Sequence, residues 1–294
     1  MVNRGWVVVG LGMVVASIAP LPLPLDADAG DGGNDVVERR LVLDWAEEML
    51  TIRGEDVPGG EIRVWYLEAF CRAGSTDRDW AETVIPHRSE LVERAEDGSR
   101  LVVRSRLADG VVVTSVVEAG EGEVRFDVEA HNPTGVDSEV HWAQPCIRVD
   151  RFVGVEPRHG SEEYLPKCFV FVDGTARFMP TEPWAREARY VPGQVWCPKG
   201  VPRTDVNPRP LSELEPSPGL IGCVSQDGTK LLATVWEPYQ ELFQGVIVCL
   251  HADFRIGGLQ AGERKRARGT IYVMENDLDQ LLRRYRRDYE NSGR

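Results

Sequence analysis

The sequence predicts an all-β protein: a large antiparallel β-sandwich, similar to a supersandwich, with a C-terminal α-helix. Over residues 124–130 every second side chain is apolar, which is the period of a half-buried strand. Short turn signals separate many such runs, and short connections join antiparallel strands. These turn signals are Asp97-Gly98, Asp109-Gly110 and Asp227-Gly228. Helical periodicity is confined to the C-terminal end of the chain.

The N-terminal segment, residues 1–29, has the pattern of a secretory signal peptide. Arg4 is followed by an uncharged apolar run, and Ala27-Asp28-Ala29 suits cleavage after Ala29. The alternative is an uncleaved membrane anchor, but the apolar run is shorter than the ~20 residues that span a bilayer. We therefore expect export to the periplasm or the extracellular space, without stable membrane insertion after cleavage. Residues 30–35 are expected to be a linker.

Residues 36–294 are predicted to form a single β-sandwich domain. We expect strands at 36–52, 61–72, 84–94, 100–107, 111–118, 123–131, 139–153, 220–226, 230–236, 245–251 and 266–274. Residues 155–218 contain eleven of the 19 prolines and are expected to be an irregular loop region over the sheet, with strands only near 167–173 and 175–179.

The helix is predicted at 276–289. Asn276 suits the N-cap, and acidic residues follow it where the helix dipole is positive. Four arginines (Arg283, Arg284, Arg286 and Arg287) crowd its last turns. The chain as a whole carries 47 acidic and 34 basic residues, a net charge of −13. Because nucleic-acid binders usually have the opposite balance, we expect a solvated basic face on the helix and no nucleic-acid partner.

The run 139–150 predicts the floor of a polar cleft. If it is a strand, Trp142, Gln144 and Arg148 share one face, and the opposite face is apolar. An indole, an amide and a guanidinium are unusual on a packed face. For Arg148 the alternative is a structural ion pair with Asp150 or Glu68.

Glu68 is the first candidate for catalysis. It lies among apolar residues in 61–72, which is apolar on both faces and therefore predicted to be a central strand. A carboxylate there must be paired, have a raised pKa, or line a cleft. As a general acid or base it would need a partner. The candidate partners are His87, His141 and His251. His251-Ala252-Asp253 is predicted at a strand end, where it would place two ligands or an acid–base pair; the alternative is a hydrogen-bonded strand terminus.

Carbohydrate sites combine aromatic faces with planar polar side chains, and this sequence contains both. The candidate substrate-binding residues are Trp142, Gln144, Arg148, Arg72, Tyr66 and Trp196. No nucleophile elbow, phosphate loop, metal-ligand spacing or cofactor motif occurs, so we expect neither a metal nor a cofactor. The six cysteines are expected to form one disulfide at most, with Cys168–Cys197 as the best candidate.

The run 50–154 resembles the galactose-mutarotase-like β-supersandwich superfamily. The resemblance lies in the strand with Ile85 and His87, the meander after it, and the His-Asn-Pro-Thr turn at 131–134. That superfamily includes sugar epimerases, polysaccharide-lyase domains and non-catalytic accessory domains of glycosidases. The resemblance therefore implies the fold and a sugar ligand. The catalytic histidine pair and glutamate of mutarotases have no residue-by-residue match here.

Three functions follow as hypotheses. The first is an exported carbohydrate-active protein that binds a sugar or oligosaccharide in a cleft on a sheet face, with acid–base chemistry of an epimerase, lyase or hydrolase. The second is a non-catalytic carbohydrate-binding module. The third is a structural envelope protein that mediates protein contacts. The sequence does not define the oligomeric state.

Overall fold

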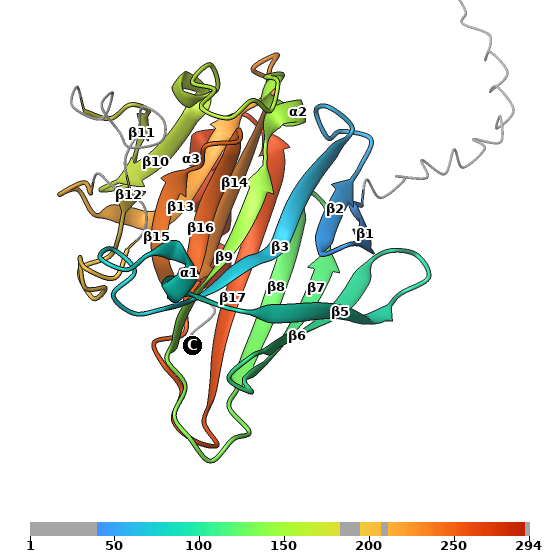
Figure 1. Cartoon of the computed structure of the whole chain (residues 1–294). Coiled ribbons are helices and arrows are strands. Elements are labelled where there is room, and N and C mark those ends of the chain that lie inside the picture. The colour runs from blue at the N-terminus through green and yellow to red at the C-terminus, as the bar shows by residue number, and fades with distance from the viewer. Residues whose placement is uncertain (1–39, 183–194, 207–210, 292–294) are drawn as a thin grey trace, which may run out of the picture. The chain divides into compact units, whose positions relative to one another are not determined.

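The computed structural model describes residues 40–182, 195–206 and 211–291 (Figure 1). The signal peptide and linker predicted at 1–29 and 30–35 lie outside these residues. Within them, no helix has both the length and the apolar character that a membrane span needs.

Two antiparallel sheets make up most of the described chain. The first, here sheet A, has the order β1-β2-β3-β9-β16-β15-β12, and β4 pairs with β3. Its strands are β1 (Val42–Ala46), β2 (Met49–Arg53), β3 (Glu61–Arg72), β4 (Val84–Ile85), β9 (Val140–Arg148), β12 (Val195–Trp196), β15 (Tyr239–Gln244) and β16 (Cys249–Arg255).

The second sheet, here sheet B, has the order β11-β10-β13-β14-β17-β8-β7-β6-β5. Its strands are β5 (His87–Arg94), β6 (Arg100–Leu107), β7 (Val112–Ala119), β8 (Glu123–His131), β10 (Cys168–Val172), β11 (Thr175–Phe178), β13 (Pro216–Val224), β14 (Lys230–Glu237) and β17 (Arg264–Glu275).

The main hydrophobic core contains side chains from both sheets, which confirms the predicted antiparallel sandwich. Aromatic rings contact each other across the two layers. The ring centroids of Phe126 in sheet B and Tyr66 in sheet A are 5.3 Å apart, and those of Trp236 in sheet B and Phe254 in sheet A are 4.6 Å apart. The Tyr66 hydroxyl also donates a hydrogen bond to Ser115 Oγ of sheet B, at 2.9 Å. The Tyr66 side chain therefore points into the interior of the sandwich.

The C-terminal helix is confirmed, and it ends in a π-helical turn. The helical segments are α1 (Trp80–Thr83), α2 (Asp150–Val153), η1 (Leu165–Lys167), α3 (Leu278–Tyr285) and η3 (Arg286–Glu290). The N-cap of α3 is Asp277 instead of Asn276, because the Asp277 carboxylate accepts a hydrogen bond from Gln280 N at 2.8 Å. The buried face of α3 packs on sheet B in a second apolar cluster.

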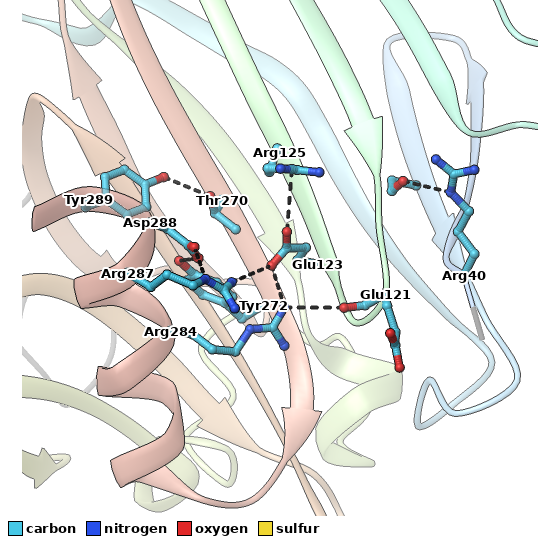
Figure 2. Close-up of polar contacts among 11 residues, drawn as sticks. Arg40, Glu121, Glu123, Arg125, Thr270, Tyr272, Arg284, Arg287, Asp288 and Tyr289 are labelled. Carbon is cyan, nitrogen blue, oxygen red and sulfur yellow. Dashed lines mark hydrogen bonds and ion pairs between the residues drawn. The ribbon is translucent and has the colours of Figure 1, made fainter. Parts of the chain in front are cut away.

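The basic run of this helix is tied to the sandwich (Figure 2). Arg284 donates to the Glu123 carboxylate at the start of β8, and Arg287 lies 3.8 Å from the same carboxylate. The Tyr272 hydroxyl of β17 donates to Asp288 at 2.9 Å. These contacts give two of the arginines a structural role.

Two strand predictions were wrong at their ends. Residues 245–251 do not form one strand, because the chain turns after Gly245, whose N–H donates to Cys249 O at 2.8 Å. The result is the hairpin of β15 and β16. The strand predicted over 139–153 ends at Arg148, and α2 follows it. His251 consequently lies in the middle of β16 instead of at a strand end.

The predicted Cys168–Cys197 disulfide is also wrong. All six cysteines are free and buried. Cys168 packs in the main core, whereas Cys197 packs in a small separate cluster with Val201 and Val206.

Candidate functional site on the outer face of sheet A

Polar side chains gather on the face of sheet A that points away from the core. β9 lies between β3 and β16 (Figure 1), and cross-strand partners include Trp65 with Cys146, Ala69 with Gln144, and Cys249 with Arg148. Paired residues point to the same side of a sheet. The register therefore confirms that Gln144, Cys146 and Arg148 share one face.

A β-bulge brings Glu68 to this face. Between Trp65 and Ala69 the register of β3 shifts against β9, so that extra residues of β3 are accommodated. Gln144 Nε2 then donates to Glu68 Oε2 at 3.0 Å. Simple alternation placed Glu68 on the same side as Tyr66, and the bulge is the physical reason that the two point to opposite sides.

Below Glu68, the floor of the site is a buried cluster of thiols, imidazole and carboxylate. Cys249 Sγ lies 3.4 Å from His251 Nε2, and His251 Nδ1 lies 3.8 Å from Asp253 Oδ1. The Phe243 ring stacks on the imidazole, with centroids 4.2 Å apart and planes 4° from parallel. His251 is 3% exposed and Asp253 is 0% exposed.

Burial and close contact shift the pKa values in this cluster. Burial raises the pKa of Asp253 to about 7, and the charge of Glu68 adds to the effect. A hydrogen bond between Cys146 and Cys249 raises the pKa of Cys146 and lowers the pKa of Cys249 well below its ordinary value. Burial opposes the charged form of His251, but the Cys249 thiolate and Asp253 outweigh it and raise the pKa of His251.

The half-buried rim of the site consists of Trp65, Glu68 and Arg148. Arg148 forms no ion pair with any residue that the structure describes, and its Nε is buried without a hydrogen-bond partner among them. Asp150, one of its predicted alternative partners, pairs instead with Arg63 at 3.5 Å.

The far end of the face is covered. Asp205, in the segment 195–206, accepts hydrogen bonds from Gly74 N at 2.8 Å and from Arg255 Nη1 at 3.2 Å. His141 Nδ1 lies 3.6 Å from the same carboxylate. These contacts join two loop segments to β16 and assign His141 to a structural network.

The structure separates the predicted site residues into two groups. Glu68, Gln144, Arg148 and His251 lie together on the outer face. The other predicted residues are buried or are held by other contacts. Tyr66 and Trp196 are buried in the main core, and His87 Nε2 lies 3.0 Å from Leu67 O beside the Phe70 ring. Trp142 lies on the same face as Gln144, because it pairs with Cys71 in the same register, but its side chain is fully buried against Cys71 and Val84. Arg72 donates to the carbonyls of Glu82 and Val84.

The sequence did not point to Cys146 and Cys249 as site residues, and it singled out Asp253 only as the neighbour of His251. Cys249, His251 and Asp253 stand at alternate positions, so any strand through them places all three on one face. That pattern was a usable signal, but a strand predicted to end near residue 251 hid it.

The sequence matches no protein-family model and no curated protein. The structure is similar to solved structures that share little sequence with it. A galactose mutarotase-like protein from Lactobacillus casei is 6% identical, with 79% of this chain and 99% of that chain covered and a TM-score of 0.42. A putative aldose 1-epimerase from Escherichia coli K12 is 8% identical, with 80% and 99% covered and a TM-score of 0.41.

An α-N-acetylgalactosaminidase from Bifidobacterium bifidum is 12% identical, with 86% of this chain and 38% of that chain covered and a TM-score of 0.46. All three proteins are named for sugars.

Proposed function

We propose that the protein binds a sugar or oligosaccharide on the outer face of sheet A. The observation that carries this proposal is the grouping of Glu68, Gln144 and Arg148, in which the amide holds the carboxylate at 3.0 Å and the guanidinium has no described ion-pair partner. Planar carboxylate, amide and guanidinium groups can bridge pairs of sugar hydroxyls. The half-exposed indole of Trp65 lies on the same face and offers an apolar surface to the C–H groups of a sugar ring.

Glu68 is the group that we propose for acid–base chemistry in an epimerase, lyase or hydrolase reaction. The Glu68 side chain is half-buried, so part of it remains exposed to solvent. Gln144 orients the first oxygen. A carboxylate fixed by one hydrogen bond and open on the other side suits proton transfer to a bound substrate.

The test combines ligand binding with turnover. A panel of mono- and oligosaccharides is screened for thermal stabilisation, since a ligand at 100 times its dissociation constant stabilises by about 2.7 kcal/mol. Arg148→Met should weaken binding of the sugar that scores, whereas Arg106→Met, at an exposed site of sheet B, should not. Anomer exchange or product formation is then followed by NMR, and Glu68→Gln should abolish it.

Each outcome has a distinct meaning. Binding without turnover in the unaltered protein would establish the non-catalytic module. The absence of any sugar-induced stabilisation would refute the proposal and favour a structural envelope protein. Full turnover in Glu68→Gln would exclude Glu68 as the acid or base.

We also propose that the protein is exported by residues 1–29. The pattern in the sequence supports this, and mass spectrometry of the native protein tests it. The expected N-terminus is Gly30, and a chain that keeps residues 1–29 would contradict the proposal.

A further inference from the structure

We propose that Cys146, Cys249 and His251 bind one thiophilic metal ion, with Zn²⁺ as the reference ion, on the floor of the outer face of sheet A. Their ligand atoms all lie within 4.8 Å of one another. Zn–S and Zn–N bonds of about 2.3 and 2.0–2.1 Å place ligand atoms of a tetrahedral site about 3.6–3.8 Å apart. The 3.4 Å between Cys249 Sγ and His251 Nε2 is close to that spacing. The proposal goes beyond sugar binding and does not depend on it.

Two paired strands supply the ligands. Cys146 belongs to β9, and Cys249 and His251 belong to the neighbouring β16, so the ligands sit on a rigid part of the sheet. All three residues are at most 3% exposed. Two sulfurs and an imidazole favour Zn²⁺ or Cu⁺ over Mg²⁺ and Ca²⁺, which prefer oxygen ligands.

Gly245 keeps space open beside the ligand atoms. A Cβ at this position would lie 2.3 Å from Cys249 Sγ and 3.0 Å from His251 Nε2. The φ of Gly245 lies outside the left-handed region, so its backbone conformation does not by itself require glycine. The absence of a side chain here therefore serves the space around the thiol and the imidazole.

The surroundings of His251 orient its Nε2 toward the thiols. Phe243 stacks flat on the imidazole, and the Asp253 carboxylate lies 3.8 Å from Nδ1. Metal-bound histidines commonly have a carboxylate on the other ring nitrogen, which fixes the ring and its tautomer. Asp253 thus acts as a positioning residue instead of a ligand.

The same groups have two other possible uses, and the geometry disfavours one of them. A nucleophilic cysteine needs one thiol that a substrate can reach, but Cys249 is 2% exposed. The cluster also contains a second thiol, that of Cys146. A nucleophilic cysteine has no need of a second thiol, whereas a metal site uses it as a ligand. The remaining use is a Cys146–Cys249 disulfide, which excludes metal binding and which the experiment detects.

The experiment measures metal per chain in the full-length purified protein. Protein stripped with EDTA is reloaded with Zn²⁺, and metal is counted by mass spectrometry. We expect one ion per chain, lost in Cys146→Ala and in Cys249→Ala but kept in Cys223→Ala, which removes a buried free thiol of sheet B. Co²⁺ in place of Zn²⁺ should give a thiolate-to-metal charge-transfer band that the first two variants lose.

Two milder variants guard against loss of the fold. Gly245→Ala should lower metal occupancy through its Cβ, whereas Gly135→Ala, where a Cβ meets nothing within 4 Å, should not. Asp253→Asn should weaken Zn²⁺ affinity about 10- to 100-fold.

The proposal is overturned if the unaltered protein binds no Zn²⁺ above background. It is equally overturned if all variants bind the same amount, or if intact mass shows an oxidised Cys146–Cys249 pair. Sugar binding is scored separately with Arg148→Met, so either proposal can fail alone.

Discussion

The hydrogen bond between Tyr66 and Ser115 links the two sheets, and its removal should lower stability without affecting a ligand on the outer face. Tyr66 is 1% exposed and Ser115 is 2% exposed. The hydroxyl-to-hydroxyl distance is 2.9 Å. Tyr66→Phe removes the donor hydroxyl and leaves the buried Ser115 Oγ without this hydrogen bond. Such a change costs about 1–3 kcal/mol in the free energy of unfolding.

Urea unfolding and thermal melting measure this loss. For a chain of this size each kcal/mol lowers the melting temperature by about 2–4 °C. Adding Ser115→Ala completes a double-mutant cycle, and we expect a coupling energy of at least ~0.5 kcal/mol. Strictly additive effects of the two changes would refute the inter-sheet hydrogen bond. A loss of sugar affinity with unchanged stability would refute the placement of Tyr66 in the core.

Two further predictions concern the ends of elements. Asp277→Ala should lower the free energy of unfolding by about 1 kcal/mol, because it removes the acceptor for Gln280 N. Asp277→Asn keeps an acceptor and should cost much less. Equal losses of stability in urea unfolding of the two variants would contradict the cap. The Asp227 carboxylate accepts hydrogen bonds from Ser225 Oγ and Thr229 N, which lower its pKa from 3.8 to about 2. Because the folded pKa is the lower one, this contribution is complete above pH 3.8 and is lost as the pH falls through 2. A carboxyl NMR titration with a midpoint at the unfolded value would contradict it.

Much of the fold could be predicted because burial on one side of a strand leaves a period of two in the sequence. The predicted strand over 61–72 coincides with β3, and the meander from 84 to 131 corresponds to β4 to β8. The predicted run 245–251 lacks this signal, because both faces of the β15–β16 hairpin are buried. The apolar turn between β15 and β16 therefore resembles a strand in the sequence, and the predicted strand began before the start of β16.

The position of Glu68 could not be predicted, because alternation holds only while the ladder is regular. The extra residues of β3 between Trp65 and Ala69 are accommodated by a bulge, and the sequence of β3 alone does not reveal what β9 offers opposite them. The same bulge turns Glu68 toward Gln144 and leaves Tyr66 in the core. The site therefore depends on the pairing of two strands that are distant in sequence.

The buried thiols illustrate why composition and spacing miss a site that a sheet assembles. Sequence searches for metal sites look for ligands grouped within one short segment. Here the whole Pro-rich region 155–218 lies between Cys146 and Cys249 in the chain, yet β9 and β16 are neighbours in sheet A. Each cysteine alone looks like a small core residue. Only their cross-strand placement, with His251 and the side-chain-free Gly245 beside them, distinguishes a set of ligands from ordinary packing.

The floor and rim of the outer face are also adjacent, since Cys146 and Gln144 stand two positions apart on β9 and point to the same side. An ion on the floor would therefore add positive charge beside the residues proposed to bind the sugar.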